Sequence, residues 1–180
     1  MMYIALLRAV NVGGQHKIKM ADLRRVLAAQ GLQDPKTYIQ SGNILFDSND
    51  TEESLQKLVE NTIEEHFGFP IDVILRNVAE LDEMLDHCPY FRQDNESSSA
   101  NLHVALLRQP PSLKATAQLG KYTSPYERFQ ILGRDIYLLL EQGMRNSKLA
   151  PQIHNLGTTA TIRNWKTLTK LRTMAHETKE

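Results

Sequence analysis

The first forty residues alternate between an apolar run and an amphipathic stretch, which predicts a strand followed by a helix. The run from Tyr3 to Arg8 is rich in strand formers and ends at Asn11-Val12-Gly13-Gly14, a sequence typical of a turn. Leu23, Val26 and Leu27 then recur at helical spacing before Gly31 stops the pattern.

A hairpin and a second helix follow. The segments Thr37 to Gln40 and Ile44 to Phe46 flank Ser41-Gly42-Asn43, where glycine and asparagine tolerate the positive φ of a tight hairpin, so we expect two antiparallel strands. Asp50-Thr51-Glu52-Glu53 has the spacing of a capping box, and the apolar face behind it predicts a helix that Gly68 ends.

One more strand completes the first half. Ile71, Val73 and Leu75 alternate as in a strand, and Asn77 and Glu80 then cap a short helix. The resulting order of strand, helix, strand, strand, helix, strand is that of a ferredoxin-like unit.

The chain after residue 100 repeats much of this pattern. His103 to Arg108 shares its last four residues, Ala-Leu-Leu-Arg, with Tyr3 to Arg8. A helix near 113–119, strands near 128–132 and 136–140, and a helix from Ser147 follow in the same order. A last helix is predicted with Thr161 as its N-cap and Trp165, Leu168 and Leu171 facing inward.

These patterns define the expected architecture. We predict an α+β fold of two ferredoxin-like subdomains that arose by internal duplication, with a C-terminal helix. The first subdomain is expected to span 1–92 and the second 101–180, and the polar, serine-rich segment from Gln93 to Ala100 is expected to link them.

Composition narrows the class of protein. The chain holds 41% hydrophobic and 23% charged residues, and it has no apolar stretch near the ~20 residues that span a bilayer. Arg8 and Asn11 interrupt what would be the apolar segment of a signal peptide, and the single cysteine, Cys88, excludes an internal disulfide. We therefore expect a cytoplasmic protein without a membrane partner. Its net charge is zero, but basic residues are in excess in 1–46 and 145–180 and acidic residues in 47–96.

Several motifs resemble those of a known bacterial family. They are Tyr3 to Arg8 with Asn11-Val12-Gly13-Gly14, Thr37 to Asn43, Ser147-Lys148-Leu149, and Ala160 to Thr167 running on to Leu171. Together they resemble domain of unknown function family 1697 (DUF1697) over essentially the whole chain. The resemblance implies two α+β subdomains and brings no activity, cofactor or catalytic residue. Ala9 stands where the family usually has glycine, so we expect no positive φ at this position.

Two segments of the first half suggest ligand binding. The backbone N–H groups of Gly13-Gly14 and the ammonium groups of Lys17 and Lys19 could receive a phosphate, although a plain turn with exposed lysines explains the same residues. The segment matches neither G-x-x-x-x-G-K-[ST] nor G-x-G-x-x-G. In the hairpin, alternation places Ile39 toward the core and gives Tyr38 and Gln40 a shared polar face, although turn geometry alone explains 41–43.

The last predicted helix suggests a second basic surface. Arg163, Lys166 and Lys170 have i, i+3, i+7 spacing and would share one face, beside an inward-facing Trp165. The alternative is a solvated face. We expect this helix and the Gly13-Gly14 loop to form one positive cleft. The candidate ligand-binding residues are Arg8, Asn11, Gly13, Gly14, Lys17, Lys19, Tyr38, Gln40, Ser41, Asn43, Lys148, Arg163, Asn164 and Lys170.

The histidines, serines and carboxylates show no pattern of a known metal site or catalytic motif. The six histidines have no ligand spacing, no G-x-S-x-G elbow is present, and the carboxylates sit at predicted helix starts, so we expect no metal, no cofactor and no serine hydrolase. The function we favour is a binding module for a phosphate-bearing ligand, either a nucleotide or a nucleic acid. The alternatives are a metal-independent enzyme for a small phosphorylated or nucleotide-like substrate, with Arg8, Lys17, Lys148 or Arg163 stabilising charge, and an adaptor that presents its acidic middle segment.

Overall fold

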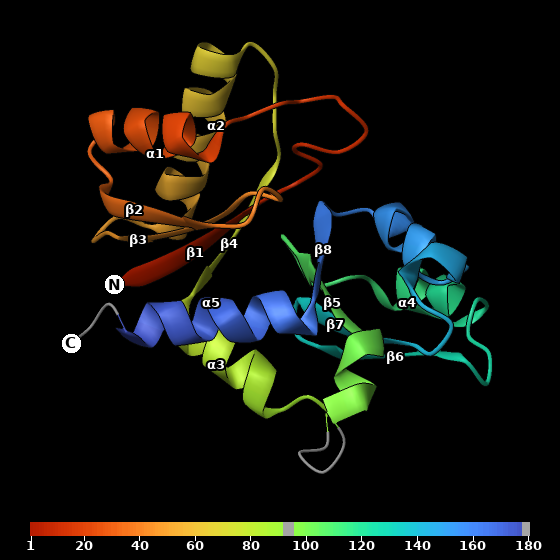
Figure 1. Cartoon of the computed structure of the whole chain (residues 1–180). Helices are drawn as coiled ribbons and strands as arrows, with labels where there is room; N and C mark the ends of the chain where they lie inside the picture. The colour runs from red at the N-terminus through yellow and green to blue at the C-terminus, as the bar shows by residue number, and fades with distance from the viewer. Residues whose placement is uncertain (92–95, 178–180) are drawn as a thin grey trace. The chain divides into compact units, whose positions relative to one another are not determined.

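The computed structural model describes residues 1–91 and 96–177 and contains two four-stranded antiparallel sheets, each accompanied by helices (Figure 1). The chain divides into two compact units, Met1–Leu81 with Leu171–Glu180, and Asp82–Lys170. We describe each unit by itself. The linker expected at Gln93 to Ala100 lies partly outside the described residues, and the boundaries expected at 92 and 101 stay predictions.

The first unit follows the predicted element order. Its sheet has the strand order β2-β3-β1-β4. The elements are β1 (Met2–Leu7), α1 (Met20–Ala29), β2 (Gln33–Tyr38), β3 (Asn43–Asp47), α2 (Glu52–Phe67) and β4 (Val73–Asn77), after which α3 (Val78–Asp86) begins. The α+β class and the alternation of strands and helices predicted for this half are confirmed.

Local capping explains where α2 begins and ends and where α3 begins. Thr51 is the N-cap of α2, and its hydroxyl accepts a hydrogen bond from the Ser54 N–H at 3.2 Å. Gly68 ends α2 with φ +83°, a conformation that favours glycine. Asn77 and Glu80 form a reciprocal capping box at the start of α3, with both side-chain-to-backbone distances at 2.9 Å.

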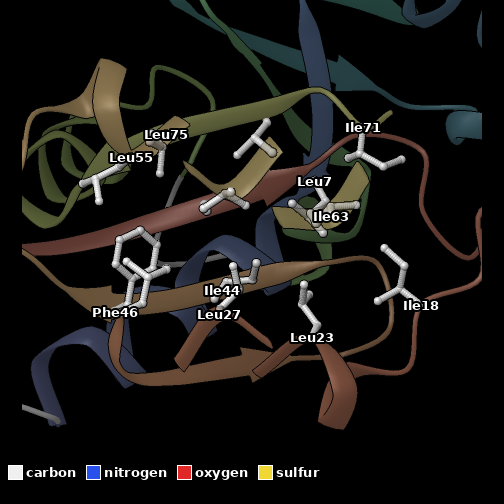
Figure 2. Packing of buried hydrophobic residues seen from close by; sticks show 14 of the residues in the cluster. Leu7, Ile18, Leu23, Leu27, Ile44, Phe46, Leu55, Ile63, Ile71 and Leu75 are labelled. Carbon is white, nitrogen blue, oxygen red and sulfur yellow. The ribbon is translucent and has the colours of Figure 1, made fainter. Parts of the chain in front are cut away.

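The core of the first unit lies between one face of its sheet and helices α1 and α2. Alternate residues of β1 and β3, such as Leu7, Ile44 and Phe46, pack against Leu27 of α1 and Leu55 of α2 (Figure 2). All six residues of β1 are buried, so this central strand is covered on both faces of the sheet. Fixing the central strand in this way fixes the position of the loop that leaves it.

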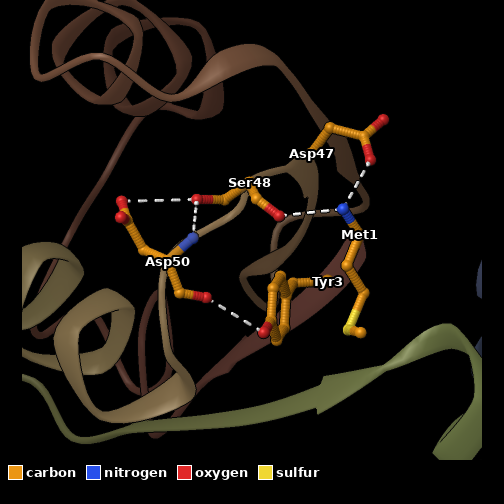
Figure 3. Close-up of polar contacts among 5 residues, drawn as sticks. All are labelled: Met1, Tyr3, Asp47, Ser48 and Asp50. Atoms are coloured by element: carbon orange, nitrogen blue, oxygen red, sulfur yellow. Dashed lines mark hydrogen bonds and ion pairs between the residues drawn. The ribbon is translucent and has the colours of Figure 1, made fainter.

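The start of the chain is fastened to the segment between β3 and α2. The Met1 ammonium group donates to the Ser48 carbonyl oxygen at 2.8 Å and lies 3.6 Å from a carboxylate oxygen of Asp47 (Figure 3). The Tyr3 hydroxyl donates to the Asp50 carbonyl oxygen at 3.1 Å. These contacts fix the register at which β1 enters the sheet.

The second unit has a sheet of the same kind, with strand order β6-β7-β5-β8. Its elements are β5 (Leu102–Leu107), α4 (Leu113–Gly120), β6 (Glu127–Leu132), β7 (Asp135–Leu140), the 3-10 helices Met144–Asn146 and Ala150–Asn155, β8 (Ala160–Asn164) and α5 (Trp165–Glu177), and the 3-10 helix Glu96–Asn101 precedes β5. The helix predicted from Ser147 is thus replaced by short 3-10 turns.

The start of the last helix differs from the prediction. Residues Ala160–Asn164 form strand β8, and α5 begins at Trp165, so Thr161 is not an N-cap. Asn164 has the capping role instead, because its side-chain oxygen accepts from the Thr167 N–H at 2.8 Å. Trp165 is buried, as predicted.

The two sheets are duplicates, as predicted. Strands β1 and β5 occupy the same place in the strand order, and their pairing registers agree: Ala5 faces Ile44, and Ala105 faces Ile136. The Leu7 N–H donates to the Gly42 carbonyl oxygen and the Leu107 N–H to the Arg134 carbonyl oxygen, both at 2.8 Å. The equivalence therefore extends to individual hydrogen bonds.

The duplicates differ in several connections, of which two that leave or join neighbouring ends of the sheet strands are longer in the first unit, while residues 121–126 between α4 and β6 outnumber residues 30–32 between α1 and β2. Residues 8–19 join β1 to α1, whereas only residues 108–112 join β5 to α4. Residues 39–42 join β2 to β3, whereas only residues 133 and 134 join β6 to β7. The connections 8–19 and 39–42 are thus elaborations of the first unit.

Candidate functional site

A pocket of about 630 Å³ opens in the first unit where the two longer connections meet. It is lined by Asn11, Gly14, Lys17, Ile18, Lys19, Asp22, Gln40 and Phe67. Five of these, Asn11, Gly14, Lys17, Lys19 and Gln40, are candidates from the sequence. The loop after β1 and the hairpin, which the sequence analysis treated as separate candidates, thus line one pocket.

The loop 8–19 has an unusual backbone. Ala9, Asn11 and His16 have φ values of +56°, +55° and +49°, and Gly13 and Gly14 are left-handed as well. The expectation that Ala9 avoids positive φ is wrong, because alanine adopts here the conformation that glycine would adopt with less strain. A left-handed L-residue costs roughly 1–2 kcal/mol. Such strain persists only where surrounding contacts hold the backbone, and it is concentrated at functional sites.

Two tethers hold this loop. The Asn11 amide nitrogen donates to the carbonyl oxygens of Ile18, at 3.0 Å, and Gln40, at 2.7 Å, while its side-chain oxygen accepts from the Ile18 N–H at 2.9 Å. Farther along, the His16 ring stacks on Phe69 with ring centroids 4.6 Å apart. Asn11 therefore closes the loop on itself and joins it to the hairpin.

The hairpin is a four-residue turn, not the turn at 41–43 that the sequence suggested. Strand β2 ends at Tyr38, and Ile39 has φ +51° and is 48% exposed, so the prediction that Ile39 faces the core is wrong. Gly42 has φ +82° and no room for a side chain, because a Cβ atom there would lie 2.7 Å from the Leu7 Cβ. The turn packs closely against the end of β1.

Asn43, Tyr38 and Ser41 form the frame of this turn. Asn43 is fully buried, and its amide nitrogen donates to the Tyr38 carbonyl oxygen at 2.9 Å and to the Ser41 hydroxyl at 3.0 Å. These three candidates are outside the pocket lining, and their side-chain and backbone groups hold the shape of the turn that presents Gln40.

The charges around the pocket favour an anion. Lys17 and Lys19 are exposed, and within the described residues neither forms a hydrogen bond or ion pair through its side chain. The third charged lining residue, Asp22, lies 3.7 Å from Arg25, which partly offsets its charge. Lys19 is also the N-cap of α1 and provides no side-chain cap, so the first-turn N–H groups of this helix have no side-chain acceptor there.

Two other candidates of the first unit lie outside the lining. The Arg8 guanidinium is 3.3 Å from an Asp72 carboxylate oxygen in an ion pair. Gly13 is exposed and shapes the loop through its φ of +59°.

In the second unit, Lys148 belongs to a motif that binds a buried carboxylate. Glu127 accepts hydrogen bonds from the N–H groups of Lys148 and Leu149, each at 3.0 Å, and from the Ser147 hydroxyl. Burial by itself would raise the pKa of Glu127, but these donors outweigh it and lower the pKa. Ser147-Lys148-Leu149 therefore has a structural role, while the Lys148 side chain lines a separate pocket of about 280 Å³.

Arg163 does not contribute to an exposed basic stripe. It lies in β8, is 8% exposed, and donates to the Thr161 hydroxyl at 2.7 Å and to the Ile162 carbonyl oxygen at 3.2 Å. Burial lowers its pKa to about 10. The stripe predicted for Arg163, Lys166 and Lys170 is therefore wrong, because α5 begins after Arg163 and only the two lysines lie on it.

The remaining candidates of the second unit are Asn164, which lines a pocket of about 500 Å³ with Phe91 and Trp165, and Lys170, which is exposed on α5. The expected cleft between the Gly13-Gly14 loop and these residues involves both units, so it stays a prediction.

Within residues 1–91 and 96–177, no group of three or more histidine, cysteine, aspartate or glutamate side chains could hold a metal ion. No helix in the same residues has the length and apolar character needed to cross a membrane.

Sequence reasoning missed Ile18, Asp22 and Phe67 as lining residues. Ile18 alternates with two lysines, a pattern that signals a side chain turned inward between two turned outward. Phe67 ends α2, and nothing in the local sequence connects it with the loop fifty residues earlier.

Comparison with known proteins supports the fold and identifies a family. A conserved bacterial protein, SP0830, from Streptococcus pneumoniae has a similar structure, with a TM-score of 0.76 and 26% sequence identity over 97% of this chain and 98% of that chain. A search of curated protein sequences found no match. The family model described as protein of unknown function (DUF1697) matches residues 1–137. The chain therefore belongs to the DUF1697 family.

Proposed function

We propose that the protein is a binding module for a phosphate-bearing ligand, a nucleotide or a nucleic acid, and that the ligand occupies the pocket between loop 8–19 and the β2–β3 turn. The observation that carries this proposal is the state of Lys17 and Lys19. Both line the pocket, and their ammonium groups have no partner among the described residues. An anion that approaches Gly14 would meet two cations and the N-terminal end of α1.

The internal duplication supports a role for these connections beyond folding. The second unit forms the same sheet with residues 108–112 and a two-residue hairpin, so this architecture does not require the longer connections 8–19 and 39–42. The first unit also holds Ala9 and Ile39 in left-handed conformations that are unfavourable for these side chains. Strained, elaborated connections that line a pocket are typical of binding sites.

The test is a thermal-shift screen of the purified protein against nucleotides, phosphorylated sugars and short oligonucleotides, followed by titration calorimetry of each compound that raises the unfolding temperature. A ligand that binds the native state raises its stability by mass action. The double variant Lys17→Ala/Lys19→Ala should weaken binding by about tenfold or more, because it removes two charged hydrogen-bond donors.

The matched control is Lys114→Ala, which removes an exposed lysine from α4 in the second unit. It should leave affinity unchanged. The proposal would be abandoned if no compound binds, or if the double variant binds as tightly as the wild-type protein. Turnover of a bound phosphate ester would favour the alternative of a metal-independent enzyme at the same pocket.

A further inference from the structure

We infer, on the basis of the proposed function, that the pocket takes one mononucleotide, with its phosphate at Lys17 and Lys19 and its ring against Phe67, and that it does not bind a nucleic acid strand. The chemistry of the lining has two parts. Lys17, Lys19 and Gly14 offer charge and a backbone N–H, whereas the partly buried Phe67 offers apolar surface. A ligand that uses both parts must combine an anion with an apolar or planar group.

The volume of the pocket fits a ligand of this size. At about 630 Å³ it lies within the range of roughly 300–1,000 Å³ that is typical of small-molecule sites. A phosphate alone would fill a small part of it. A polymer would need an open groove that continues beyond the pocket.

Phe67 is suited to stack on a base. It is the last residue of α2 and is half-buried against the core, which holds its ring while part of it lines the pocket. The His16–Phe69 stack fastens the loop close to this end of α2. Gln40, on the opposite connection, has an amide that can both donate and accept hydrogen bonds at a base or sugar edge.

The other cations of residues 1–81 either have side-chain partners or are buried. Nucleic acid strands are held by rows of lysine and arginine that replace counterions at successive phosphates. In residues 1–81 these cations are engaged elsewhere, in the pairs Arg8–Asp72, Arg25–Asp22, Lys36–Asp34 and Lys57–Glu53, in the Arg24–Thr37 hydrogen bond, and in the buried Arg76. Within residues 1–81, Lys17 and Lys19 are thus the two cations without a side-chain partner, enough for one phosphate group.

The experiment compares ligands that contain parts of a nucleotide. Calorimetric titrations use AMP, GMP, CMP and UMP, ribose 5-phosphate, the four nucleosides, and single-stranded oligonucleotides of increasing length. We expect at least one mononucleotide to bind about tenfold more tightly than ribose 5-phosphate, because stacking of a base on an aromatic ring adds about this factor. Lys17→Ala/Lys19→Ala should weaken both ligands. Phe67→Leu should weaken only the mononucleotide.

Phe129→Leu is the matched control, since Phe129 is a half-buried phenylalanine that packs against the core of the second unit. If Phe67→Leu lowers the unfolding temperature more than Phe129→Leu does, the variant is destabilised and its affinity is not compared. The test is then made on the wild-type protein, by measuring nuclear Overhauser contacts between base protons and the Phe67 ring. Their presence supports the inference, and their absence in a saturated complex refutes it.

The outcomes separate the two proposals. Equal affinity for ribose 5-phosphate and every mononucleotide overturns the inference and leaves the proposed function standing. The same holds if oligonucleotides bind more tightly as their length grows, with a steep dependence on salt. Failure of ribose 5-phosphate, mononucleotides and oligonucleotides alike to bind overturns both.

Discussion

The side chain of Asn11 should be worth a measurable part of the stability of the first unit. It makes three hydrogen bonds, to Ile18 twice and to Gln40 once, and is half-buried. At the lower half of the usual 0.5–1.5 kcal/mol for each bond, their loss costs about 2 kcal/mol. Asn11→Ala adds about 1 kcal/mol because alanine tolerates φ +55° poorly, whereas Asn11→Gly removes the same bonds without that strain.

We therefore expect the free energy of unfolding to fall by about 3 kcal/mol for Asn11→Ala and about 2 kcal/mol for Asn11→Gly. Urea titrations followed by circular dichroism measure both, and equal m-values show that the comparison is valid. Gln15→Ala, at an exposed position in the same loop, is the control and should change little. A neutral Asn11→Gly would show that the tether contributes nothing, and equal losses for the two variants would contradict the left-handed backbone at this residue.

Further predictions concern three other strained or buried groups, and each is checked by the same urea titration. Ala9→Gly should raise the free energy of unfolding by about 0.5–1 kcal/mol, because glycine adopts φ +56° without strain; a loss of stability would contradict the assigned conformation. Glu127→Ala should cost about 3 kcal/mol by leaving the N–H groups of Lys148 and Leu149 unpaired. Since the pKa of Glu127 is lowered in the folded state, its contribution is present above the unfolded pKa of about 4.3 and is lost as pH falls further, so Glu127→Gln should flatten the acid limb of the stability curve. Arg163→Ala should cost about 2–4 kcal/mol because the arginine is buried, in contrast to a change below about 0.5 kcal/mol for the exposed Lys170→Ala.

Much of the fold could be predicted from local sequence, because helix caps, left-handed glycines and the pattern of apolar residues lie within the elements that they define. The capping signal at 50–53, the left-handed Gly68, the apolar run of β1 and the alternation before and in β4 are local, and they led to the correct element order in the first half, although the N-cap is Thr51 and not Asp50. The repeated Ala-Leu-Leu-Arg, together with the order of elements that follows it, identified equivalent strands. A second repeat would have corrected the error at the last helix: Arg76-Asn77 and Arg163-Asn164 each end a strand, and the asparagine caps the helix that follows.

Thr161 was misassigned because threonine and asparagine both cap helices, and the sequence holds both within four residues. Residues Ala160–Asn164 pair with β5 as strand β8, so the helix begins after Asn164 and Asn164 is its N-cap. The local sequence also did not reveal that Arg163 is buried in a strand, because a basic residue at helical spacing usually faces solvent. Its role depends on the sheet, which is a long-range property.

The candidate site could be predicted only in part. Glycines and lysines in 13–19 suggested an anion site or a plain turn, and the anion site stays a prediction. The conformation of this loop depends on contacts that are distant in sequence, from Asn11 to Gln40 and from His16 to Phe69. Phe67 lines the same pocket although it is distant from this loop in sequence. Ile39 was misplaced because the turn starts two residues earlier than its glycine suggested, which ended the alternation of β2 at Tyr38.

The close packing of Gly42 has a consequence for how this site can evolve. The frame of the turn depends on the Leu7–Gly42 backbone hydrogen bond and on a position where no side chain fits, and neither residue lines the pocket. Gln40 and Lys17, which do line it, are exposed and can be exchanged without disturbing that frame. Under the proposed function, a single substitution at Gln40 or Lys17 would change the ligand preference, whereas any side chain at position 42 would disturb the scaffold.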